Sequence, residues 1–156
     1  MKARRIFLVA AFCLSAVVPS FAADANANLG AWKLNAGKSK TTPGSPKNNT
    51  VVYTAAGDSY KCVVDGEDGA GKPTHNEWTG KFDGKDYAVT GDPTADTRAL
   101  QMVDAHHYNL TNKKGGKATT TGTIAISADG KSRTVTTHLT DAKGKEVTNT
   151  AVYDRQ

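Results

Sequence analysis

The chain has 156 residues, the size of one domain, and its 20 basic and 15 acidic residues give a formal net charge of +5. Three of the basic residues, Lys2, Arg4 and Arg5, stand ahead of the apolar run Ile6–Val18, so the rest of the chain carries 17 basic against 15 acidic residues. A chain this close to neutral, with no basic stripe interleaved with aromatic residues, is not expected to bind nucleic acid.

The start of the chain has the organisation of a Sec-type signal peptide. A basic stretch is followed by an apolar run too short to span a bilayer, then by Pro19 and small residues at the cleavage position. We therefore expect residues 1–22 to be cleaved, residues 23–28 to form a flexible leader, and residues 29–156 to form one domain. The mature protein is then periplasmic or secreted, with no membrane contact after signal cleavage. Cleavage leaves Cys62 as the only cysteine, so the domain has no internal disulfide and needs a substantial core.

Beyond the leader, the sequence predicts about ten short β-strands. Apolar and polar residues alternate in runs that turn residues interrupt every roughly 8–12 residues. No stretch keeps apolar residues at helical spacing for three turns, so we expect at most a single helical turn, at Pro93–Thr97. Asp129–Gly130 indicates a two-residue hairpin. The expected strands are 29–35, 51–55, 60–64, 75–79, 86–90, 97–103, 106–112, 118–127, 132–140 and 146–154.

These strands are expected to close into a barrel. After the proline-containing loop Ala36–Asn48 every connection is short, so strands that are neighbours in sequence should pair antiparallel. An open sheet would expose two edges, and pairing of the first strand, which contains Trp32, with the last, which contains Tyr153, removes both. The predicted fold class is therefore all-β: a single antiparallel up-and-down β-barrel, with little or no helix outside the signal peptide.

Two segments resemble a known group of barrels. Gly30-Ala31-Trp32-Lys33-Leu34 resembles the Gly-x-Trp strand that opens lipocalins and fatty-acid-binding proteins, and Asp129 to Tyr153 resembles the last hairpin of the latter, which also have ten strands. The likeness covers about a third of the chain and implies a calycin-like barrel that binds a ligand inside. The chain is also similar to small exported bacterial proteins that begin Leu-Gly-x-Trp-Lys-Leu-Asn.

The chain departs from fatty-acid-binding proteins at two places. Those proteins insert two short helices after the first strand, and Ala36–Asn48 is too short and too proline-rich for them. In their closing strand, an Arg two residues before a Tyr grips the ligand carboxylate. Tyr153 matches the Tyr, but the Arg position is occupied by Ala151. Arg155, Arg133 or Arg98 would replace it only with a side chain that points inward.

The interior of such a barrel holds either side chains or one small ligand, and both interpretations stay open. In the first, a small, partly apolar molecule binds by desolvation against aromatic residues. In the second, a filled barrel is an exported protein-interaction module or inhibitor that uses Ala36–Asn48 and the hairpin tips to bind a protein partner. The candidate ligand-binding residues are Tyr53, Tyr60, Trp78, Tyr87, Tyr108, Arg133, Tyr153 and Arg155.

No motif indicates a metal, a cofactor or catalysis. His75 and Glu77 share a strand face, but His106 and His107 point to opposite faces, so at most one of these two can join a metal cluster. No third ligand stands at a spacing that is characteristic of a metal site. A calcium loop that began at Asp65 would lack its closing acid. Because the sequence also has neither a nucleophile motif nor a phosphate-binding loop, we expect a protein that is not an enzyme.

Overall fold

The computed structural model describes residues 26–140 and 144–156, and these residues form strands and loops with no helix. The expected signal peptide and the first part of the expected leader lie outside the described residues. The all-β class is confirmed. The strands are β1 (Gly30–Leu34), β2 (Lys47–Ala56), β3 (Ser59–Glu67), β4 (Pro73–Gly80), β5 (Asp83–Thr90), β6 (Thr97–Met102), β7 (His107–Lys114), β8 (Lys117–Ile126), β9 (Ser132–Thr140) and β10 (Glu146–Arg155).

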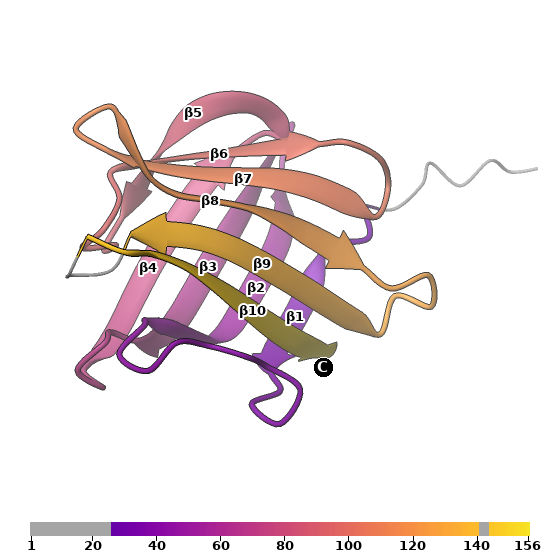
Figure 1. Ribbon diagram of the computed structural model, residues 1–156. Helices are drawn as coiled ribbons and strands as arrows, with labels where there is room; N and C mark the ends of the chain where they lie inside the picture. Colours follow the sequence, from indigo (N-terminus) through magenta and orange to yellow (C-terminus); the bar gives the residue numbers. More distant parts are fainter. Residues whose placement is uncertain (1–25, 141–143) are drawn as a thin grey trace, which may run out of the picture.

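The sheet closes on itself as the sequence predicts. Every strand pairs antiparallel with its neighbour in sequence, and β1 pairs with β10, which completes the order β1-β10-β9-β8-β7-β6-β5-β4-β3-β2 (Figure 1). In the closing ladder, Trp32 lies opposite Arg155 and Leu34 lies opposite Tyr153. Because both chain ends are paired, the described strands leave no open sheet edge.

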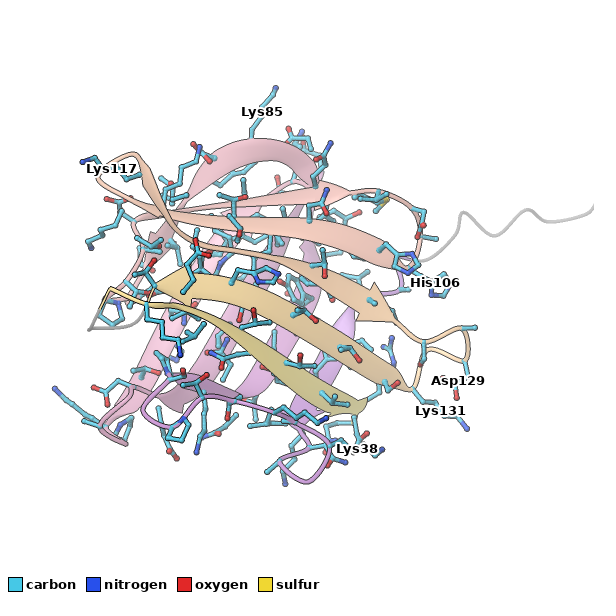
Figure 2. The ribbon with its side chains drawn as sticks, in the orientation of Figure 1. Lys38, Lys85, His106, Lys117, Asp129 and Lys131 are labelled. Atoms are coloured by element: carbon cyan, nitrogen blue, oxygen red, sulfur yellow. The ribbon has the colours of Figure 1, made fainter. Side chains whose placement is uncertain are left out.

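Alternation along each strand separates an inner from an outer face. In β4, Asn76 and Trp78 are buried, whereas the intervening residues are more accessible. Charged side chains gather outside the barrel: Lys85, Lys117 and Lys131 point away from it (Figure 2). Each strand therefore contributes one row of side chains to the interior and one row to the surface.

The up-and-down order gives the barrel two different ends. The connections β2–β3, β4–β5, β6–β7 and β8–β9 lie at one end, together with the start of β1 and the end of β10; we call it the terminal end. The connections β1–β2, β3–β4, β5–β6, β7–β8 and β9–β10 lie at the other, which we call the loop end. Figure 1 shows the β7–β8 connection at the left and the β6–β7 and β8–β9 connections at the right.

Aromatic side chains fill the interior near the terminal end. Phe82, in the connection between β4 and β5, stacks on Tyr60 with ring centroids 4.4 Å apart and meets Tyr108 edge-on at 5.2 Å. Trp78 and Tyr53 each lie 6.0 Å from the same ring. Rings at these separations gain interaction energy in addition to that from burying their apolar area. This cluster therefore packs the barrel interior tightly at the terminal end.

A second set of contacts covers the terminal end from outside. The guanidinium carbon of Arg155 lies 4.2 Å from the centroid of a Trp32 ring. Its nitrogens donate hydrogen bonds to the carbonyls of Ala27 at 2.7 Å, Leu29 at 2.6 Å and Gly130. The indole nitrogen of Trp32 also donates to a backbone carbonyl, that of Asn28, at 2.9 Å. These contacts hold the residues ahead of β1 across the terminal end.

The loop between β1 and β2 contains no helix and runs alongside β10. Lys40 and Thr150 exchange two backbone hydrogen bonds of 2.7 and 2.8 Å. The backbone nitrogen of Thr42 donates to the side-chain oxygen of Asn149 at 2.7 Å. The loop is therefore fixed beside the opening at the loop end.

Candidate ligand-binding cavity

The barrel interior contains a cavity of about 670 Å³ that is open at the loop end. Every strand except β5 contributes to its wall, and residues of the connecting loops, such as Gly44, Gly69 and Pro93, form its rim. This volume falls within the range of about 300–1,000 Å³ that small-molecule sites occupy. The interior is thus filled near the terminal end and hollow toward the loop end.

The wall of the cavity changes in polarity with depth. Its middle is apolar and includes Val51, Val64, Leu110, Ile124 and Val135. Nearer the opening stand four amide side chains, each close to the loop end of its strand: Asn48, Asn76, Asn112 and Asn149. Apolar walls desolvate a ligand, and a few placed polar groups orient it.

The deepest part of the cavity centres on Arg133. Its Cα lies opposite that of Tyr153 in the β9–β10 ladder. The guanidinium carbon is 5.4 Å from the ring centroid of Tyr153 and 5.5 Å from that of Tyr53. The residue is only 4% exposed, and its Nε is buried with no hydrogen-bond partner among the described residues.

The groups around Arg133 are neutral at physiological pH. Burial raises the pKa of the Tyr53 and Tyr153 hydroxyls, although the positive charge of Arg133 opposes this shift. Burial likewise raises the pKa of the Cys62 thiol. Arg133, whose guanidinium stays protonated, therefore carries a full charge among uncharged neighbours.

A second buried arginine, Arg98, has a different environment. Its Nε donates to the side-chain oxygen of Asn112 at 3.0 Å. A terminal nitrogen lies 3.3 Å from a carboxylate oxygen of Asp92 and 3.5 Å from the side-chain oxygen of Asn76. The side chains of Arg98 and Asp92 are 9% and 12% exposed. Arg98 is thus a cavity-wall residue whose positive charge is balanced by Asp92.

The structure separates the candidate ligand-binding residues into two sets. Tyr53, Arg133 and Tyr153 line the cavity. The other five do not border it: Tyr60, Trp78 and Tyr108 surround Phe82, Tyr87 contacts the edge of Trp78, and Arg155 covers the terminal end. Whether either set contacts a ligand stays a prediction.

Several lining residues were not among the candidates. Arg98 and the amides Asn76, Asn112 and Asn149 all border the cavity. For two of them, alternation along the strand predicts a side chain that faces the interior: Asn76 shares its strand face with the aromatic Trp78, and Arg98 shares its strand face with the apolar Leu100. A polar residue on an otherwise apolar strand face is the pattern that indicates such a lining residue.

The histidines lie apart from the cavity. On the outer face of β4, His75 contacts Asp65 at 2.6 Å and Glu77 at 3.7 Å, and Asp65 raises the pKa of this histidine. Residues 26–140 and 144–156 contain no group of three or more His, Cys, Asp or Glu residues placed to hold a metal ion. The surface cluster is therefore a set of exposed ion pairs.

Comparison of the sequence with protein-family models and with curated proteins finds no match. The strand pairing alone places the chain in the class of closed ten-stranded antiparallel barrels, which is compatible with a calycin-like fold. In the part of the chain that the structure describes, no helix is long and apolar enough to cross a membrane.

Proposed function

We propose that the protein binds a small, partly apolar molecule inside the barrel, as lipocalins and fatty-acid-binding proteins do. The cavity of about 670 Å³, open at the loop end, is the observation that carries this proposal. Empty space in a protein forfeits dispersion contacts and lowers stability. A domain that acted only through its surface would be more stable with a filled interior, so the cavity favours ligand binding over the solid interaction module.

The proposed role is binding without a chemical step. The apolar middle of the cavity would remove the body of the ligand from water, and the amides near the opening would hydrogen-bond its polar groups. The signal-like start of the chain supports a periplasmic or secreted location, where such a protein would carry or sequester its ligand.

Native mass spectrometry tests this proposal on the protein isolated from the periplasm of its source. We expect a bound small molecule whose mass disappears on denaturation. Release of no small molecule, together with capture of a stoichiometric protein partner, would support the interaction module instead.

A dye-binding experiment tests the location. Phenylnaphthylamine, which fluoresces on entering apolar sites, should bind the wild-type protein. Ala151→Phe places a ring in the cavity and should abolish binding, since Ala151 lines it. Ala88→Phe is the matched control, because Ala88 is an exposed strand residue that does not border the cavity. Equal loss in both variants, or in neither, contradicts a site inside the barrel.

A further inference from the structure

We propose that the ligand is a compact organic anion whose acid group binds Arg133 at the bottom of the cavity. This inference rests on the proposed function and adds the chemical class of the ligand. Arg133 is a buried charge that has no counter-ion among the described residues. No carboxylate of the described residues lies within ion-pair distance of Arg133, and its side chain donates no hydrogen bond to a described residue.

Burial makes this situation costly for the empty protein. A guanidinium loses its hydration when it is 4% exposed, and contacts with two aromatic faces replace only part of that loss. A carboxylate or sulfonate at this position would restore the missing charge balance. The planar guanidinium presents paired N–H groups that match the two oxygens of such an acid.

The neighbours of Arg133 suit an anion as well. Tyr153 lines the cavity, and its hydroxyl makes no hydrogen bond with any described residue. Because burial keeps this hydroxyl protonated, it can donate to an acid oxygen. Neither of the two acidic residues that line the cavity lies at its bottom: Asp92 pairs with Arg98 nearer the rim, and Asp68 lies in the β3–β4 connection at the loop end.

The polar upper wall limits the rest of the ligand. Beyond the apolar middle, a ligand anchored at Arg133 would meet Asn76, Asn112 and Asn149. The side-chain oxygens of these amides already accept hydrogen bonds from Arg98 or from the backbone of Thr42, but their NH2 groups donate to no described residue. A long alkyl chain would displace water from these NH2 groups and offer no acceptor, which is unfavourable for polar groups. A compact body with hydrogen-bonding groups at its far end fits both regions. We therefore expect long-chain fatty acids to be poor ligands.

Two dyes that differ in one group test the inference. Anilinonaphthalene sulfonate is phenylnaphthylamine with an added sulfonate, which stands in for the acid of the ligand. Arg133→Met should weaken binding of the sulfonate dye by about tenfold or more, as expected for loss of a charged hydrogen-bonding partner. Binding of the neutral dye should not weaken. Arg133→Lys, which keeps the charge, should retain most of the affinity for the sulfonate dye.

Lys33→Met is the matched control, because it removes an exposed positive charge outside the cavity. It should leave the binding of both dyes unaffected, and palmitate should compete poorly with the sulfonate dye.

Equal weakening of the binding of both dyes by Arg133→Met, or the same loss of binding in Arg133→Lys as in Arg133→Met, overturns the anion site while leaving the carrier function intact. Failure of both dyes to bind the wild-type protein overturns both proposals. If Arg133→Met does not fold, high sodium chloride should weaken only the sulfonate dye on the wild-type protein, and an equal effect on both dyes refutes the site.

Discussion

Arg98 and Arg133 are the two arginines buried in the described part of the chain, and only Arg98 has a counter-ion. Cation–π contacts contribute about 0.5–2 kcal/mol each, whereas an unpaired buried charge costs several kcal/mol. Arg133 is therefore expected to lower the stability of the ligand-free protein. A stability cost retained at one position is common where that position serves binding.

This contrast predicts opposite results for two matched substitutions. Arg133→Met should leave the free energy of unfolding unchanged or higher, because it removes an unpaired charge and keeps a side chain of similar length. Arg98→Met should lower it by about 2–4 kcal/mol, since Asp92 is left buried without its partner. Urea unfolding followed by tryptophan fluorescence measures both. An equal loss in the two variants would show that Arg133 has a structural role.

His75 gives a pH-dependent prediction on the outer face. Asp65, at 2.6 Å, raises the pKa of His75 in the folded protein, with a smaller contribution from Glu77. The resulting stabilisation is present below the unfolded pKa of about 6.5 and fades as the pH rises through the folded value. An NMR titration should find His75 above its ordinary pKa, and Asp65→Asn should lower it. Asp58→Asn, which removes a partner of Lys81 instead, is the control and should leave the His75 titration unchanged.

Among the elements, the ladder between β1 and β10 decides whether the sheet is a barrel. It is short, since three residue pairs of β1 face β10. Arg155 extends it, because its side chain stacks on Trp32 and reaches three carbonyls on the residues ahead of β1 and in the β8–β9 connection. The closure therefore depends on a side chain as well as on backbone pairing.

Arg155→Met should lower the free energy of unfolding by about 1–3 kcal/mol, from the lost hydrogen bonds and the lost contact with Trp32. Lys38→Met, in the loop that follows β1, removes only an exposed ion pair with Asp154 of β10 and should change the stability by less than about 0.5 kcal/mol. Chemical denaturation measures both variants. Indistinguishable midpoints would contradict a closing role for Arg155.

The connection between β8 and β9 shows where local signals are wrong. Asp129–Gly130 predicted a two-residue hairpin, but five residues, 127–131, separate the strands. The hydroxyl of Ser127 donates to Asp129 at 2.6 Å and accepts from the backbone of Ser132 at 2.9 Å. These side-chain bonds stabilise a wider turn, in which Gly130 adopts a φ of 68°. The dipeptide identified the turn correctly and its length incorrectly.

For the whole molecule, the sequence predicted the barrel better than the cavity. Alternation and short connections determine which residues face inward, and the exposed edges required Trp32 to meet the last strand. Depth along the barrel has no such local pattern. Tyr53 and Tyr60 lie on one face of one hairpin, yet Tyr53 borders the cavity and Tyr60 packs on Phe82. The sequence indicates Arg98 only as a replacement for the missing Arg, because its pairing with Asp92 depends on a loop conformation that composition does not specify.

Methyl NMR of the wild-type protein, titrated with anilinonaphthalene sulfonate, tests most directly whether the barrel is a hollow container. Val51 and Val64 line the cavity, while their neighbours Val52 and Val63 face the other side of the same strands. We predict large shifts for the methyl groups of Val51 and Val64 and small ones for Val52 and Val63. Shifts confined to Val52 and Val63, or absent from all four valines, would contradict a ligand inside the barrel.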